Sequence, residues 1–279
     1  MKSIRSVSVA LSIAASIAAL PIVALSQTVY AESSYGEFGK LNITTGVFTE
    51  LAPDSGPYAI AFAADGNLYG AEGRIVTFNL TTGITTGGPA TGSANFGLAK
   101  GPDDNTLYAT GSGGDLRTIN LLTGTVTYVG GNGLPFRADG WFGATYNQNG
   151  VLYSALVNDN NYDQGIYSIN TSTGAAALVH DFGIGHLLSG FVPIGTHLYS
   201  FDYINNAFYN RTNEIFDYTG GVLVDTHVAV TGLTNPLDSI IATAYLPTAT
   251  PEPGSIALLA SGGIVGGLAL RRRFRAQNR

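Results

Sequence analysis

Apolar and polar residues alternate along short segments in the middle of the chain, which is the pattern of half-buried β-strands. Residues 75–78 (Ile-Val-Thr-Phe) and 125–129 (Thr-Val-Thr-Tyr-Val) are two examples. Residues 59–62 and 142–146 are instead rich in small and apolar side chains, which suits strands in a crowded interior. Residues 7–19 and 254–270 are longer, uncharged and mostly apolar. The pattern therefore predicts an all-β middle region between two terminal segments of a different kind.

Two short motifs recur in constant order through this middle region. An apolar residue followed by Asn-x-x-Thr-Gly occurs four times, with a shortened fifth copy that contains Asp217; the asparagines are Asn42, Asn79, Asn120 and Asn170. Asparagine bonds to the backbone two residues on and glycine supplies a positive φ, so the motif predicts a hairpin turn. A Leu-Tyr pair falls between successive copies, at Leu68, Leu107, Leu152 and Leu198.

The glycines of the first motif are 37, 41, 50 and 46 residues apart. A period of about 40 residues with four short antiparallel strands is typical of a β-propeller blade. Complete units fill residues 57–230, and a hairpin at 39–51 with a lone strand at 238–245 can pair into a composite blade that closes the ring. We therefore predict an all-β, five-bladed β-propeller. A β-sandwich is the alternative, but it would leave the two-motif period unexplained.

These units resemble the quinoprotein-like propeller repeats of extracellular bacterial proteins. The resemblance rests on the Leu-Tyr and Asn-x-x-Thr-Gly motifs. It implies the architecture alone.

Residues 1–31 have the parts of a secretory signal peptide. Lys2 and Arg5 give a charged start and an apolar stretch follows. Residues 29–31 (Val-Tyr-Ala) end the segment with small residues at the positions that a signal peptidase reads, which predicts cleavage after Ala31. Cleavage after Ser26 is the alternative. The propeller is accordingly predicted to span residues 32–248.

Residues 249–279 combine three parts. Pro251-Glu252-Pro253 comes first, and its prolines hold the glutamate in an extended segment. The 17 residues 254–270 carry no charge and would form a helix about 25 Å long, at the short end of what spans a bilayer. The arginine cluster Arg271, Arg272, Arg273 and Arg275 follows and would stay on the cytoplasmic side.

This order of parts resembles the PEP-CTERM sorting tail of Gram-negative bacteria. The resemblance implies transient insertion in the inner membrane, cleavage near Pro-Glu-Pro by an exosortase-type transpeptidase, and delivery to the cell surface or to an exopolysaccharide (biofilm) matrix. A plain C-terminal membrane anchor is the alternative interpretation.

Charge and cysteine content narrow the choice of partners. Residues 32–250 hold 18 acidic and six basic residues, a net charge of −12 against −6 for the whole chain. A surface this acidic argues against nucleic acid as a partner. The chain has no cysteine, which excludes disulfides, thiolate nucleophiles and cysteine metal ligands.

Propellers bind ligands on the face built by the loops between blades and between the second and third strands of a blade. Here those loops are predicted at residues 130–141, 158–165, 180–186 and 202–212. Aromatic rings that could stack on a sugar lie there beside acidic and basic groups. The candidate ligand-face residues are Arg137, Asp139, Trp141, Tyr162, Asp181, His186 and Tyr203. The alternative for Trp141 is simple core packing.

The residues do not predict a catalytic, cofactor or metal site. Residues 159–164 resemble the start of a calcium loop but lack the glycine at its sixth and the glutamate at its twelfth position. His180 and His186 could share a metal with Asp181, but their spacing is not diagnostic.

These observations favour an exported, non-enzymatic surface or matrix protein whose partners are a signal peptidase, an exosortase and an exopolysaccharide or protein ligand. The alternative is a secreted propeller hydrolase or lyase acting on polysaccharide. Release of products from an acidic polysaccharide, abolished by Asp139→Asn or Asp181→Asn, would favour that alternative.

Overall fold

The computed structural model describes residues 27–245, except 54–55, 57–58, 72, 93–96, 112, 137, 140–144, 149, 159, 161–162, 185, 206–213, 220–221 and 235–238. The signal peptide predicted upstream of residue 27, the apolar segment 254–270 and the arginine cluster lie outside these residues. Within them, no helix is long and apolar enough to cross a membrane.

The described strands form five antiparallel sheets. Blade 1 combines β21 (Ile240–Ala244) with β1 (Thr28–Ser33), β2 (Phe38–Asn42) and β3 (Phe48–Ala52). Blade 2 contains β4 (Ile60–Phe62), β5 (Leu68–Ala71), β6 (Arg74–Phe78) and β7 (Thr85–Ala90). Blade 3 contains β8 (Gly97–Lys100), β9 (Thr106–Thr110), β10 (Leu116–Asn120) and β11 (Val126–Gly130).

The last two blades contain the longest strands, which reach nine residues. Blade 4 contains β12 (Ala138–Asp139), β13 (Thr145–Gln148), β14 (Val151–Asn158), β15 (Asp163–Ile169) and β16 (Ala176–Ile184). Blade 5 contains β17 (His186–Ile194), β18 (His197–Asn205), β19 (Glu214–Thr219) and β20 (Val222–Ala229). β12 and β13 both pair with β14, so they share the inner position of blade 4.

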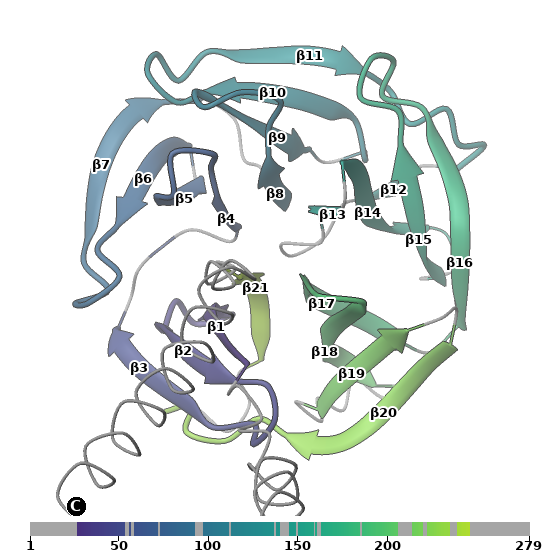
Figure 1. Ribbon diagram of the computed structural model, residues 1–279. Coiled ribbons are helices and arrows are strands. Elements are labelled where there is room, and N and C mark those ends of the chain that lie inside the picture. Colours follow the sequence, from purple (N-terminus) through teal and green to yellow (C-terminus); the bar gives the residue numbers. More distant parts are fainter. Residues whose placement is uncertain are drawn as a thin grey trace, which may run out of the picture.

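The blades stand around a central axis, with β4, β8, β13, β17 and β21 innermost and β3, β7, β11, β16 and β20 along the rim (Figure 1). Each inner strand contacts the next, and β21 contacts both β17 and β4, so the ring is closed. Buried apolar clusters fill the spaces between adjacent blades. The predicted five-bladed propeller is confirmed, and the β-sandwich alternative is wrong.

The repeated motifs take the places that the sequence predicts. In the four complete turns the asparagine Oδ1 accepts hydrogen bonds from the N–H groups two and three residues on, at 2.9–3.1 Å. The glycine that ends each turn has a φ of 71–76° and donates its N–H to the asparagine carbonyl at 2.8 Å. The leucine of each Leu-Tyr pair is the first or second residue of its blade's second strand, and its side chain is at most 3% exposed.

The motif glycine also meets the preceding blade. Because the outer strands run along the rim (Figure 1), the end of one reaches the third-to-fourth-strand turn of the next blade. A Cβ on Gly83 would lie 2.7 Å from the Cβ of Ala52, at the end of β3. Equivalent contacts join Gly124 to Ala90, Gly174 to Gly130 and Gly46 to Ala229. The glycine is therefore required both for its φ and for the packing of successive blades.

β1 corrects the predicted start of the propeller. The sequence interpretation assigned residues up to Ala31 to the signal peptide, but Thr28–Ser33 is a strand that lies between β2 and β21. Val29 and Ala31 are both completely buried. The composite closing blade is confirmed, but it has three N-terminal strands rather than the predicted hairpin alone.

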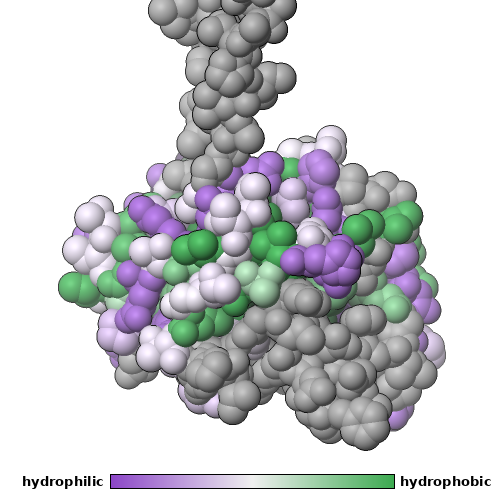
Figure 2. Space-filling model, turned by 90° about the horizontal axis from the view of Figure 1, so that it is seen from below, coloured by the Kyte–Doolittle hydropathy of each residue, from purple (hydrophilic) through white to green (hydrophobic). Residues whose placement is uncertain are grey.

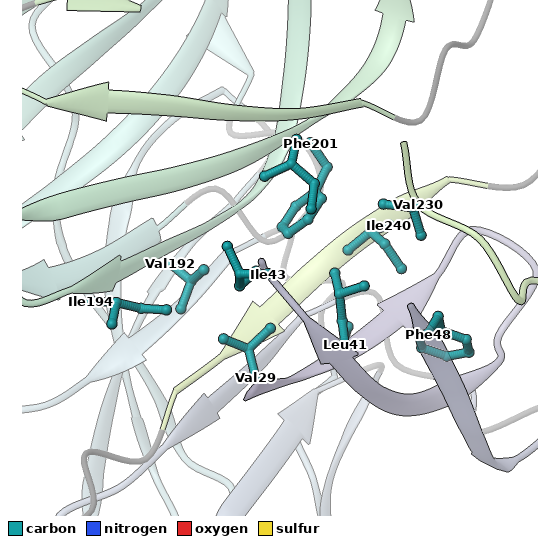
Figure 3. Close-up of a cluster of buried hydrophobic side chains, with 11 residues drawn as sticks. Val29, Leu41, Ile43, Phe48, Val192, Ile194, Phe201, Val230 and Ile240 are labelled. Carbon is teal, nitrogen blue, oxygen red and sulfur yellow. The ribbon is translucent and has the colours of Figure 1, made fainter. Parts of the chain in front are cut away.

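Contacts between blade 1 and blade 5 complete the closure. Val29, Leu41 and Phe48 pack with Phe201 and Ile240 in one buried cluster (Figure 3). The hydroxyl of Ser189 on β17 donates to the Ile240 carbonyl at 2.5 Å, and the backbone N–H of Thr234 donates to Glu37 Oε1 at 2.9 Å. Apolar and polar contacts therefore join the first and last parts of the ring.

Candidate functional site

The propeller ring has two faces, which we call the turn face and the loop face. The turn face carries the hairpins between the first and second strands of blades 2 to 5, such as 63–67 and 195–196. The loop face carries the opposite connections, including 33–37 and 111–115. Because β21 is an inner strand and β1 is its antiparallel neighbour, the chain enters at Thr28 and leaves after Ala244 on the turn face.

Six of the seven predicted ligand-face residues have no described side chain. Arg137, Trp141 and Tyr162 lie outside the described residues. Asp139, His186 and Tyr203 are described in their backbone alone, in β12, β17 and β18. Asp181 has a described side chain, which is exposed.

Several of these residues lie in strands rather than in the predicted loops. Asp181 and His180 are part of β16, His186 begins β17, and Tyr203 lies in β18. The strands of blades 4 and 5 extend further toward the loop face than the sequence pattern indicates. The predicted loops 180–186 and 202–212 are therefore corrected in large part to strand.

Asp181 lies beside a second carboxylate. Gly165 on β15 pairs with Asp181, and Asp163 stands two residues earlier on the same strand. Partial burial, followed by the charge and the hydrogen bond of Asp181, raises the pKa of Asp163. Burial and these two carboxylates also raise the pKa of Tyr167. The loop-face end of blade 4 is therefore locally acidic.

Arg117 forms an ion pair on the loop-face side of blade 3. Arg117 Nε donates to Asp115 Oδ2 at 2.7 Å, and both side chains are largely buried. The guanidinium lies against Gly111, where a Cβ would be 3.1 Å from Cζ. This ion pair supports the hairpin between β9 and β10.

A cavity that the sequence interpretation missed lies between blades 4 and 5, at their turn-face end. Its volume is about 170 Å³. Blade 4 contributes Tyr146, Tyr153, Ile166 and Val179, and blade 5 contributes Thr196, Leu198 and Tyr218. We call it the tyrosine cavity.

The tyrosine cavity has a buried base and an exposed rim. Tyr146 and Ile166 are 6% and 1% exposed, whereas Val179 is 50% exposed and Thr196 lies in an exposed turn. The rings of Tyr146 and Tyr153 stack with their centroids 5.3 Å apart. The ring of Tyr218 contacts Phe182 edge to face, with centroids 6.0 Å apart, and the ring of His180, with centroids 4.7 Å apart.

The phenol groups influence one another across the cavity. Burial raises the pKa of Tyr146 strongly, and Tyr153 and Tyr218 raise it further. The pKa of Tyr218 is also raised, first by burial and then by Tyr153. The hydroxyls of Tyr146 and Tyr218 are therefore neutral at physiological pH, and each can both donate and accept a hydrogen bond.

Part of this site was visible in the sequence. Tyr153 belongs to a Leu-Tyr pair and Tyr218 to the shortened fifth turn, but nothing in the pattern indicates that they converge with Tyr146. No group of three or more His, Cys, Asp or Glu side chains that could hold a metal occurs within the described part of the chain.

Comparisons with known proteins bear first on the tail. Residues 249–273 match the family model described as the PEP-CTERM protein-sorting motif. The predicted PEP-CTERM tail is thus confirmed, and it implies an exported protein that is processed at the membrane. No curated protein matches the chain.

Solved structures give only distant similarity. A structural genomics protein of unknown function from Bacteroides thetaiotaomicron is 14% identical, with a TM-score of 0.48. The match covers 72% of this chain and 55% of that one. TolB from Acinetobacter baumannii is 12% identical with a TM-score of 0.45, and the match covers 71% of this chain and 52% of that one. The chain thus spans about half the length of these structures. Similarity at this level carries no argument about activity.

Proposed function

We propose that this protein is an exported, non-enzymatic component of the cell surface or exopolysaccharide matrix. An exosortase-type transpeptidase cleaves it near Pro251-Glu252-Pro253, and its propeller then binds matrix polysaccharide. The observation that carries the proposal is the match of residues 249–273 to the PEP-CTERM sorting motif. The net charge of −12 over residues 32–250 is in keeping with a soluble extracellular surface.

For the N-terminus we propose that the signal peptidase cuts after Ser26. Cleavage after Ala31 would remove most of β1, whose Val29 and Ala31 are completely buried. Ala24 and Ser26 are also small residues at the positions that a signal peptidase reads. Cleavage at this bond leaves all strands of blade 1 in the mature chain.

Before it is sorted, the protein is held with its turn face toward the membrane. The chain leaves β21 on that face, and Pro251 follows Tyr245 by six residues. Six extended residues reach at most about 20 Å. The loop face therefore points away from the inner membrane until the tail is cut.

Mass spectrometry of the C-terminus tests the sorting proposal. We expect surface material to lack Arg279 and to end near Pro253. A variant with alanine at Pro251, Glu252 and Pro253 should keep its tail and stay in the membrane fraction, whereas Thr248→Ala, just outside the motif, should be processed normally. Surface protein that retains Arg279 would refute the proposal.

A further inference from the structure

We infer that the tyrosine cavity binds a single neutral pyranose ring at the end or side of a glycan. This inference deepens the proposed matrix function and rests on it for the choice of an extracellular polysaccharide as the source of the sugar. It assigns binding to the turn-face end of the junction between blades 4 and 5, away from the predicted ligand face.

The size of the cavity sets the size of the ligand. Its volume is about 170 Å³, close to the ~150 Å³ of an engineered cavity that accepts one benzene ring. It is smaller than the pockets that hold drug-sized ligands, roughly 300 Å³ and above. The cavity therefore has room for one six-membered ring, and the rest of a glycan would lie outside it.

The lining supplies the two kinds of contact that a sugar ring needs. Tyr146, Tyr153 and Tyr218 offer aromatic surface for the C–H groups of a pyranose. Their hydroxyls and that of Thr196 offer hydrogen bonds to its O–H groups.

Charge selects a neutral sugar over an acidic one. No charged side chain is among the described residues that line the cavity. The domain around it carries a net charge of −12 over residues 32–250, which repels a carboxylate. We therefore expect a hexoside to bind and the corresponding uronate to bind more weakly.

Access to the cavity is through an exposed rim. The register of β15 and β16 shifts between Ile166 and Tyr167, which leaves Val179 as a bulge without a paired residue. Val179 is half exposed and lines the cavity from blade 4, as Thr196 does from blade 5. A larger side chain at Val179 would close this entrance without entering the core.

Saturation-transfer NMR on the full chain in detergent tests the inference with methyl glycosides of glucose, galactose and mannose. We expect at least one to bind with a Kd on the order of 1 mM, since a single ring makes few contacts. Methyl glucuronide should bind at least about fivefold more weakly. p-Cresol, an aromatic ring of similar size, serves as the comparison probe.

Three variants in the cavity lining and two controls locate the binding site. Tyr153→Phe and Tyr218→Phe each remove one hydroxyl and should weaken binding about fivefold to tenfold. Val179→Trp should weaken it more than tenfold by blocking the rim. Leu178→Trp, on the same exposed strand but outside the lining, and Tyr128→Phe, on the exposed surface of blade 3, are the matched controls and should bind as the parent does.

Three results would overturn the inference: binding of p-cresol with no binding of any glycoside, no binding of any probe, or glycoside binding that Val179→Trp leaves unchanged. None of them depends on processing of the tail, which the C-terminal mass measures separately. Failure of the sugar site and failure of the sorting proposal are therefore distinguishable.

Discussion

A propeller that begins at Glu32 instead of Gln27 should lose most of its stability. The five residues removed include Val29 and Ala31, both completely buried, and Tyr30, whose ring stacks on Phe38 at 5.9 Å. Burial of these side chains stabilises the fold by about 3–5 kcal/mol. β1 is also the strand through which β21 joins its sheet, so the truncation leaves the inner strand of blade 1 without its neighbour.

This loss is large against the total stability of a domain, about 5–15 kcal/mol. For a domain of this size, 1 kcal/mol shifts the midpoint of thermal unfolding by roughly 2–4 °C, so the lost burial alone should lower it by about 6–20 °C. Because the pairing of β1 with β2 and β21 is lost as well, we expect a shift at the upper end of this range or no cooperative transition at all. The measurement is circular dichroism or calorimetry on chains that begin at Gln27 and at Glu32. Val29→Ala in the longer chain is the intermediate case, with a cost of about 2 kcal/mol.

Equal midpoints for the two chains would refute the reasoning. They would mean that residues 27–31 contribute nothing to the folded ring, although Ala31 lies between β2 and β21. A truncated chain that unfolds early while Val29→Ala is unaffected would assign the loss to strand pairing rather than to side-chain burial.

Three further substitutions test the turns and the acidic pair. Gly83→Ala should cost about 1–2 kcal/mol more than Gly66→Ala in thermal unfolding, because both glycines have a positive φ but only Gly83 abuts the preceding blade; equal costs would contradict the packing role. Asn120→Ala should cost about 1–2 kcal/mol by removing two backbone hydrogen bonds, while Asn120→Asp keeps the acceptor and most of the stability; an equal loss in both variants would count against that account. Asp181→Asn should return the pKa of Asp163 toward its ordinary value in an NMR titration. A raised pKa of Asp163 in the folded state lowers stability at pH values above it, so the variant should be more stable than the parent at pH 7, by less than about 1 kcal/mol. At a pH low enough to protonate Asp163 the two proteins should be equally stable. An unchanged pKa of Asp163 in the variant would exclude the coupling.

The ring could be predicted because its information is local and repeated. Each Asn-x-x-Thr-Gly copy specifies its own hairpin through side-chain to backbone bonds of 2.9–3.1 Å. The number of motif copies then predicts the number of blades. β1 was missed because two patterns overlap there: Val-Tyr-Ala has the small residues of a cleavage site and also the alternation of a strand. Its pairing with β21 joins residues about 210 positions apart in sequence, which no local pattern reports.

The candidate sites were less predictable for the same reason. Sequence placed Asp181, His186 and Tyr203 in loops because their strands in blades 4 and 5 run to nine residues, longer than those of the other blades. The tyrosine cavity depends on how two neighbouring blades pack, so its lining residues come from six separate segments of the sequence. Only the repeat positions of Tyr153 and Tyr218 were visible beforehand.

The central claim is that a propeller closed by β1 and β21 is released from both terminal segments. The most direct test is mass spectrometry of both termini of the mature protein from the cell surface. The account predicts an N-terminus at Gln27 and a C-terminus near Pro253. A mature chain that begins at Glu32, or one that still ends at Arg279, would contradict it.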